Sequence, residues 1–434
     1  MKGDHQNAIF QRVDSLVVNR VLMIAFHYPP LRGSSGIQRT LKFTKYLPEF
    51  GWQPIVLTAH ARSYASTSND LMGEIEHLPA VYRAFSFDSS RHLSVLGRYP
   101  KSCALPDRWV SWWLGAVPMG LYLIRKYRPT VIWSTYPIAT AHLIGLSLSR
   151  LTGLPWVADM RDPMTDVDYP PDPLVRRVYR WIERETVTRC TRAVLTTSGA
   201  VSDYKARFPQ TPPSRFHLIE NGYDEENFAS AENLVVSAAR EKRPLVLVHS
   251  GIIYPSERDP IHFFRALATM LQQDLISPHK LSVILRATAH DEYLQRLIDQ
   301  HHIGDIVSLA PPVPYKEALS EMLTADGLLI LQAANCNNQI PAKLYEYLRT
   351  RRPILALTDP AGNTAQKLLK MGIDTIAPLD SEPDIIQALT RFLELVEKNA
   401  APVAAMDRII RNSRRSRTGE LARLFEAVGP KLQD

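Results

Sequence analysis

Short apolar runs rich in β-branched residues alternate with amphipathic stretches along most of this chain. Such runs are typical of buried strands, and the amphipathic stretches between them are typical of helices that cover a sheet. The pattern therefore predicts βαβ units on a parallel sheet. In the first half the predicted strands are 21–25, 54–57, 131–133, 156–158, 193–196 and 217–219, enough for a complete Rossmann-like domain.

The same pattern begins again in the second half of the chain. Its predicted strands are 244–248, 281–285, 306–309, 327–331 and 353–357, which indicates a second doubly wound sheet. Residues 224–233 are polar and carry no strand signal, so we interpret them as the interdomain linker and place the boundary near Ser237. The predicted fold is α/β, with Rossmann-like domains over residues 17–236 and 237–403.

Composition supports a two-domain globular protein. The 434 residues exceed what one core usually holds, and 45% hydrophobic with 22% charged residues is an ordinary globular composition. The net charge of +7 suits an anionic partner, either a phosphorylated ligand or a phospholipid surface, and we expect no nucleic-acid partner. The cysteines Cys103, Cys190 and Cys336 are far apart in the sequence and lack C-x-x-C spacing, so neither a disulfide framework nor a zinc site is supported. We therefore expect the protein to work in the reducing cytoplasm.

Two segments bear on location. The first sixteen residues carry charges where a secretory signal needs an apolar core, and no run of 18 apolar residues occurs, so we expect neither export nor membrane crossing. The segment from Trp109 to Arg128 is aromatic at one end and basic at the other. It fits a helix on the inner face of the cell membrane, but a buried helix with a solvated basic turn is the favoured alternative.

The loop after the first predicted strand is a candidate site, because ligands in open α/β sheets bind where strands end and helices begin. Gly33 and Gly36 let the backbone approach a ligand, and Ser34 can donate a hydrogen bond or cap the helix. The spacing is not G-x-G-x-x-G, so no dinucleotide fingerprint is present. On the acceptor side of this loop we place Tyr28, Arg32 and Gln38.

A charged cluster follows the predicted strand at Trp156. Asp159, Arg161 and Asp162 are costly to bury without a pairing or a function. One interpretation is an Arg161–Asp162 ion pair with Asp159 capping a turn, and the other is a substrate site. Asp166 and Asp168 form a weak D-x-D match without further ligands, so we expect no metal.

Two loops of the second half carry charged residues that could bind a ligand. Arg258 precedes a helix that begins with proline and is well placed for a phosphate. Lys343 and Glu346 share one face of the helix opened by Pro341, so they could present a cation to a diphosphate and a carboxylate to ribose hydroxyls. A Lys–Glu surface pair would have the same spacing.

Taken in order, these loops resemble those of the family 4 retaining glycosyltransferases, which have the GT-B fold of two Rossmann-like domains facing across a cleft. The resemblance runs from about Arg20 to Leu369. It rests on Tyr28-Pro-Pro with Gly33 and Gln38-Arg39, on Glu220-Asn-Gly-Tyr-Asp224, and on Ile340-Pro-Ala-Lys-Leu-Tyr-Glu-Tyr-Leu348 followed by Arg352-Pro-Ile-Leu. It implies that Glu346 holds the nucleotide ribose, and it favours packing of the basic stretch 404–432 against the first domain rather than a solvated tail.

The sequence departs from the family at three places. Asn338 stands where the family has the carboxylate against the transferred sugar, Ile252 stands where an arginine is expected, and Arg161-Asp162 replaces a frequent histidine. We expect Asp162, Arg161 and Asn338 to serve as catalytic residues and Asp159 to lie on the acceptor side. The residues expected to bind the donor are Gly33, Ser34, Gly36, Gly251, Arg258, Arg286, Pro341, Lys343, Leu344 and Glu346.

The resemblance implies transfer of a sugar from a nucleotide-diphosphate sugar to a sugar, a lipid-linked acceptor or a polysaccharide precursor, with retention and without metal or other cofactor. Cations and helix N-termini would stabilise the leaving diphosphate. Two alternatives stay open. One is a nucleotide-sugar 2-epimerase of GT-B-like fold, which needs no acceptor, and the other is a non-catalytic GT-B scaffold or partner subunit.

Overall fold

The computed structural model describes residues 19–33, 36–75, 80–94, 104–166, 169–235 and 243–429. These divide into two compact units. The first comprises residues 1–195, 204–217 and 418–434, and the second comprises 196–203 and 218–417. The expected boundary residue Ser237 lies outside the described part of the chain.

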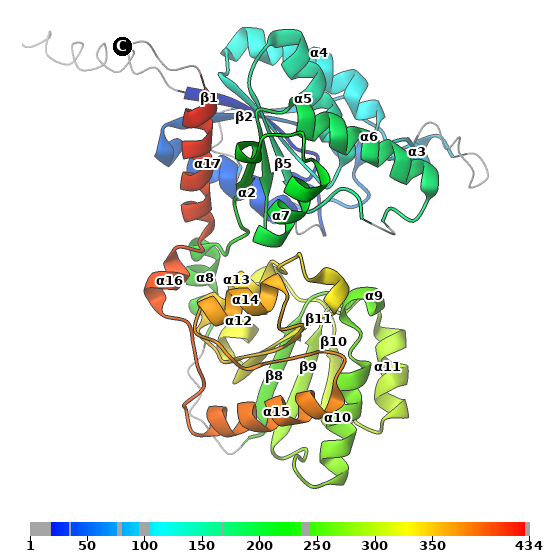
Figure 1. The fold of residues 1–434 in the computed structure, drawn as a ribbon, viewed down its shortest axis with the longest axis vertical. Coiled ribbons are helices and arrows are strands. Elements are labelled where there is room, and N and C mark those ends of the chain that lie inside the picture. The colour runs from blue at the N-terminus through cyan, green and yellow to red at the C-terminus, as the bar shows by residue number, and fades with distance from the viewer. Residues whose placement is uncertain are drawn as a thin grey trace, which may run out of the picture. The chain divides into compact units, whose positions relative to one another are not determined.

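The first unit is built on a seven-stranded sheet (Figure 1). Its order is β3 (Val81–Ala84), β2 (Trp52–Ala59), β1 (Asn19–Ile24), β4 (Val131–Thr135), β5 (Trp156–Arg161), β6 (Arg192–Leu195) and β7 (Phe216–Leu218). The pairings from β3 to β6 are parallel. Six of these strands coincide with apolar runs of the sequence. The edge strand β3 was not predicted, because its four residues are mostly half-exposed and give no continuous apolar run.

Helices cover the sheet of the first unit. They are α2 (Gly36–Tyr46), α3 (Ser89–His92), α4 (Ser111–Tyr127), α5 (Ala139–Thr152) and α6 (Pro173–Arg189), with short 3-10 turns at Leu47–Phe50, Ala61–Ser63 and Pro213–Arg215. The helix α7 (Ser198–Arg207) is shared, because its residues 198–203 belong to the second unit and its last turn to the first. The helices α4, α5 and α6 pack side by side (Figure 1). Each lies in a crossover between parallel strands, as the alternating pattern predicts.

The second unit has a six-stranded parallel sheet. Its order is β10 (Val307–Ala310), β9 (Leu281–Arg286), β8 (Leu245–Ser250), β11 (Gly327–Gln332), β12 (Ile354–Thr358) and β13 (Ile376–Ala377). Its helices are α8 (Glu225–Glu232), α9 (Pro255–Arg258), α10 (Ile261–Gln272), α11 (Asp291–Gln300), α12 (Tyr315–Thr324), α13 (Lys343–Thr350), α14 (Asn363–Lys370), α15 (Glu382–Glu397) and α16 (Met406–Ile410), with a 3-10 turn at Ala334–Cys336. Both sheets are those of a doubly wound α/β protein, as predicted.

The segment interpreted as a linker is instead the helix α8. Asp224 caps it by accepting a hydrogen bond from the backbone N–H of Asn227 at 3.2 Å. Phe228 is fully buried in a hydrophobic cluster of the second unit, and Arg349 forms ion pairs with Glu225 and Glu232. The linker prediction was therefore wrong, because one capping residue and one buried aromatic side chain suffice to dock this polar helix.

The C-terminal helix α17 (Arg414–Val428) continues into the first unit. Leu421 and Phe425 are fully buried, and the Phe425 ring lies 5.2 Å from that of Trp52, centroid to centroid. A Cβ on Gly419 would stand 3.0 Å from the Phe50 ring, so the helix approaches closely there. The apolar side of this basic stretch forms part of the first unit's core.

Candidate functional site

Lys343 lies at the start of α13 in the second unit, beside the end of β8. Its ammonium nitrogen Nζ is 2.9 Å from Nε2 of His249, which is fully buried on β8. A Cβ on Gly251 would stand 3.1 Å from the same Nζ, and Gly251 has a φ of +110°. Burial holds the pKa of Lys343 well below its usual range, and the nearby Arg258 guanidinium acts in the same direction.

Glu346 lies one turn further along α13 than Lys343. The Tyr315 hydroxyl donates to its Oε1 at 2.6 Å. Burial raises the pKa of Glu346, while Tyr315 and the Arg414 and Lys343 cations oppose that rise. The neighbouring Leu344 is fully buried, so it fixes the helix rather than presenting a polar group.

Arg258 ends the one-turn helix α9 and keeps part of its guanidinium accessible. It donates to the carbonyl oxygen of Ile252 at 2.9 Å, and its side chain is 19% exposed. Because Arg258 lowers the pKa of Lys343, the two cations act on the same region. Arg258, Lys343 and Glu346 thus gather at the carboxyl edge of the second sheet, where open α/β folds bind ligands, and the exposed Glu257 carboxylate lies 3.8 Å from Arg258.

Arg286, which was also predicted to bind the donor, forms an ion pair with a carboxylate of the second unit. Its guanidinium forms a bidentate ion pair with Glu321, at 2.9 Å and 2.5 Å, and donates to the carbonyl oxygen of Pro311 at 2.8 Å. In this geometry the charge of Arg286 is already neutralised by a carboxylate. The structure therefore does not support Arg286 as the second cation of a phosphate site.

Asn338 lies in an asparagine-rich loop between β11 and α13, before Pro341. Its side chain is exposed, and its backbone carbonyl oxygen accepts a hydrogen bond from the Thr197 hydroxyl. A Cβ on Gly199 would stand 2.5 Å from Asn338 Oδ1, so the Asn338 side chain lies close to the backbone at Gly199. The exposed amide could hydrogen-bond a sugar hydroxyl, and its catalytic role stays a prediction.

In the first unit, Asp159 takes a structural position that differs from the acceptor-side role we predicted. It is fully buried, and its two oxygens accept from the Arg39 guanidinium at 2.8 Å and 3.0 Å. The Thr135 hydroxyl donates to Oδ2 at 3.2 Å. Asp159 thus ties β5 to α2 and leaves no oxygen open to an acceptor. The predicted alternative of a turn cap at Asp159 is not what forms.

Arg161 and Asp162 follow Asp159 at the end of β5. Arg161 is half-buried with a φ of +60°, and the register between β5 and β6 shifts at this point. Its guanidinium donates to the carbonyl oxygen of Tyr136 at 3.4 Å, and it helps burial to lower the pKa of His27 to about 4. Asp162 is exposed. Arg161 and Asp162 lie at the carboxyl edge of the first sheet, and their catalytic role stays a prediction.

The loop after β1 separates into buried and exposed parts. Tyr28 is fully buried in a hydrophobic cluster, and its hydroxyl lies 3.2 Å from that of Thr44, so the structure makes it a core residue rather than an acceptor contact. Arg32 and Gly33 are exposed, and Gly33 has a φ of +83° with open space around its Cα.

Three further residues predicted in this loop lie around the start of α2. Gly36 begins the helix and is buried, and Gln38 is half-buried with its Oε1 shielded from solvent. Ser34 lies outside the described residues.

A buried carboxylate that sequence reasoning missed supports the loop after β5. Glu183, on α6, accepts from the backbone N–H of Met164, from the hydroxyls of Tyr204 and Thr165, and from the Arg207 guanidinium. Only its position on the inner side of α6 could have signalled this role. The network fixes the segment that directly follows Arg161 and Asp162 in sequence.

The motif that begins at Glu220 is also structural in its contacts. Glu220 forms ion pairs with Lys367 and Arg417, and Tyr223 pairs with Ser413 as a parallel β-bridge. A Cβ on Gly222 would stand 2.5 Å from a backbone oxygen. Within the second unit, this motif joins the chain just after the first sheet to Lys367 on α14, to Ser413 just before α17 and to Arg417 at the start of α17.

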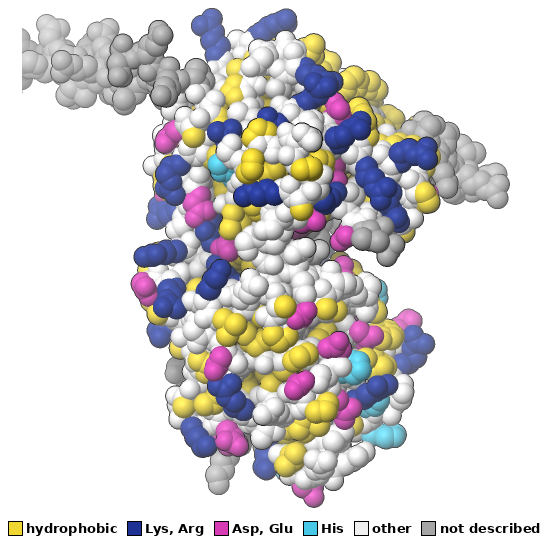
Figure 2. Space-filling model, in the orientation of Figure 1, with side chains coloured by type: hydrophobic (Ala, Val, Ile, Leu, Met, Phe, Trp, Pro, Cys, Tyr) yellow, Lys and Arg dark blue, Asp and Glu magenta, His cyan; other side chains and the backbone are white. Residues whose placement is uncertain are grey.

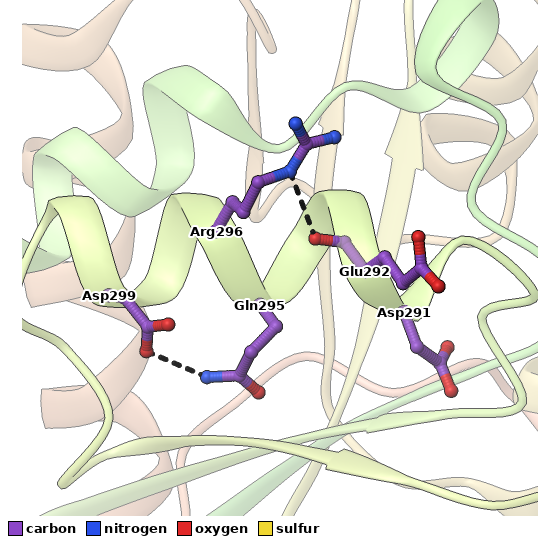
Figure 3. Close-up of a pocket in the computed structure, with 5 residues that line it drawn as sticks. All are labelled: Asp291, Glu292, Gln295, Arg296 and Asp299. Atoms are coloured by element: carbon purple, nitrogen blue, oxygen red, sulfur yellow. Dashed lines mark hydrogen bonds between the residues drawn. The ribbon is translucent and has the colours of Figure 1, made fainter.

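A surface hollow on the second unit lies apart from these groups (Figure 3). Its lining residues all belong to α11, and Gln295 Nε2 donates to Asp299 Oδ1 at 2.8 Å while Arg296 Nε donates to the backbone oxygen of Glu292 at 3.3 Å. The polar groups of one helix face thus partner one another. None of the predicted site residues lines the hollow, so we assign it no function.

The two doubly wound units define a GT-B protein. Residues 36–222 match the family described as "Glycosyl transferase 4-like domain". Over these residues, which make up less than half of the chain, the protein is similar to the family 4 glycosyltransferases.

A curated relative and two solved structures are similar to this chain. The relative, D-inositol 3-phosphate glycosyltransferase of Kineococcus radiotolerans, is 29% identical over 170 residues, which cover 35% of this chain and only 38% of the relative. Sucrose-phosphate synthase from Thermosynechococcus elongatus has a TM-score of 0.61 at 14% identity, covering 94% of this chain and 96% of that one. WaaG, a glycosyltransferase involved in lipopolysaccharide biosynthesis, has a TM-score of 0.55 at 15% identity, covering 95% and 96%. The two structures bear on the fold alone.

Proposed function

We propose that this protein transfers a sugar from a nucleotide-diphosphate sugar to an acceptor. The observation that carries the proposal is the grouping of Arg258, Lys343 and Glu346 at the carboxyl edge of the second sheet. Two cations there suit a diphosphate, and a carboxylate beside them suits the two ribose hydroxyls. The match of residues 36–222 to the glycosyl transferase 4-like family and the GT-B fold support the same assignment.

The proposed chemistry follows from these groups. Arg258 and Lys343 would stabilise the negative charge that develops on the diphosphate as the bond to the sugar breaks. That role needs no metal. We also propose that the product retains the donor's anomeric configuration, as the resemblance to the family implies, with Asp162, Arg161 and Asn338 orienting the sugars.

Turnover of a donor panel tests the proposal. Uridine and guanosine diphosphate sugars are incubated with the protein and with simple sugar or lipid-phosphate acceptors, and products are read by magnetic resonance. Release of nucleoside diphosphate together with a new glycoside supports transfer. The anomeric coupling constant of that glycoside shows whether the donor's configuration is retained or inverted. Conversion of a donor to its C2 epimer without acceptor would replace the proposal with an epimerase, and binding without turnover would favour a scaffold.

For the acceptor we propose a lipid-linked sugar or polysaccharide precursor reached at an anionic membrane surface. On α4, Leu114 is 62% and Tyr122 is 52% exposed, and Arg125 and Lys126 at its end are exposed as well. Figure 2 shows hydrophobic side chains over α4 and Lys and Arg side chains over the neighbouring α5 and α6. An apolar helix face beside basic side chains is complementary to anionic phospholipids.

Of the described helices, none combines the length and apolarity needed to span a bilayer, so the proposed contact is peripheral. Trp112 is fully buried, and its substitution would damage the core rather than a surface. The informative variant is Leu114→Ser with Tyr122→Ser, and the matched control is Leu369→Ser, an exposed leucine of the second unit. Flotation with phosphatidylglycerol vesicles should fall for the double variant and not for the control. Equal flotation of all three proteins would refute the membrane contact.

A further inference from the structure

His249 has a tautomer fixed by its surroundings. The Nδ1 atom lies 2.9 Å from the carbonyl oxygen of Leu329 on β11. A carbonyl oxygen only accepts, so Nδ1 carries the hydrogen and Nε2 keeps its lone pair. Burial and the Lys343 charge hold the pKa of His249 well below its usual range, so the ring stays neutral.

The lone pair of His249 Nε2 is directed at Lys343. The 2.9 Å contact with Nζ is a hydrogen bond that the lysine donates. Gly251 lets the backbone pass within contact distance of the same nitrogen, because any side chain there would stand 3.1 Å from it. His249 therefore holds the lysine head group, and the missing side chain at Gly251 leaves room for it at the end of β8.

The chemistry of this acceptor distinguishes it from an ordinary ion-pair partner. A carboxylate in the same place would neutralise the lysine charge and compete with an incoming anion. A neutral imidazole fixes the direction of the ammonium group without itself neutralising the charge. A structural lysine gains little from such a partner, because a partly buried charge is stabilised more by a directly bonded carboxylate than by a neutral ring.

We propose that His249 is a positioning residue that aims the Lys343 ammonium group at the diphosphate of the donor. The inference rests on the proposed function and adds a residue to it. The other charged groups that act on Lys343 are Arg258 on α9 and Glu346 on its own helix. A bound diphosphate would favour the protonated form of the lysine, so nucleotide binding should take up protons at neutral to alkaline pH.

Two substitutions of His249 distinguish the effect of losing the contact with Lys343 from the effect of disturbing the fold. His249→Asn places its amide near Nδ1, where it can still donate to Leu329, but it is too short to reach the lysine. His249→Gln extends an amide oxygen toward the place of Nε2 and can still accept. The control is His279→Leu, an exposed histidine in the loop before β9. Melting temperatures identify any variant that loses its fold.

Calorimetry with UDP and GDP in two buffers of different ionisation enthalpy measures both affinity and proton uptake. We expect His249→Asn to bind the preferred diphosphate roughly tenfold or more weakly, the cost of a misdirected charge-assisted hydrogen bond, and to change the proton uptake. Lys343→Met should show a similar loss, the double variant should lose little more, and His249→Gln should recover much of the affinity. Binding of the parent nucleoside should be unchanged.

Wild-type affinity and proton uptake in folded His249→Asn would overturn the positioning role while leaving the proposed function intact. Additive losses in the double variant would overturn it as well, because the two residues would then act independently. If the wild-type protein binds neither UDP nor GDP, the proposed donor site itself fails and this inference fails with it.

Discussion

The ion pair between Arg39 and Asp159 offers the sharpest test of how the first unit is held together. Both side chains are at most 2% exposed, and two hydrogen bonds of 2.8 Å and 3.0 Å join them. Removing one member of such a pair leaves a buried charge without its partner, which costs about 3–5 kcal/mol. In a unit of this size each kcal/mol lowers the melting temperature by about 2–4 °C, so Arg39→Met should melt roughly 6–20 °C lower.

The assay is thermal unfolding of a double-mutant cycle made of Arg39→Met, Asp159→Leu and both together. The double variant should recover most of the loss, because two apolar side chains of similar size fill the site without any buried charge. The matched control is Arg391→Met, which breaks an ion pair with Asp374 whose side chains are 52% and 53% exposed. It should change stability by less than about 1 kcal/mol. Single variants that melt within about 2 °C of the wild type, or a double variant as unstable as the sum of both, would refute the reasoning.

Three further predictions follow from described contacts. Burial lowers the pKa of His142 to about 4, so between pH 6.5 and 4 the unfolded chain binds a proton at this histidine that the folded protein does not. The free energy of unfolding should therefore fall as the pH drops from about 6.5 to 4. In urea titrations at several pH values, His142→Asn should show a smaller fall over that range. Phe425→Ala should destabilise the first unit by about 3–5 kcal/mol in calorimetry, because the ring is fully buried against Trp52, and an unchanged melting temperature would contradict this packing. Glu346→Gln should weaken binding of both nucleosides and their diphosphates, whereas Lys343→Met should affect only the diphosphates; equal effects on both ligand classes would argue against the proposed division of roles.

The sequence predicted the two sheets well, because parallel strands buried on both faces are continuous apolar runs. It failed at β3 and α8, where short or polar segments are held by tertiary contacts such as the burial of Phe228. Local pattern carries no information on contacts of that kind.

The candidate site was only partly predictable. Lys343 and Glu346 could be placed together because three positions along a helix put them on one face. The partners of buried polar side chains could not be predicted, because they are far apart in the sequence. Arg39 and Asp159 are 120 residues apart, and His249 and Lys343 are 94 residues apart. The polar residue His249, directly after the apolar run of β8, was the available signal for the second pair.

The first unit is assembled from three separate pieces of chain, the last of which begins at Thr418. During synthesis, the ribosome therefore releases the seven strands of the first sheet long before it makes the helix whose Phe425 completes their core. The core of the first unit can therefore be completed only after the second unit, residues 218–417, has been translated. Expression of residues 1–217 alone should yield an aggregation-prone fragment, and supplying the C-terminal helix in trans should rescue its solubility.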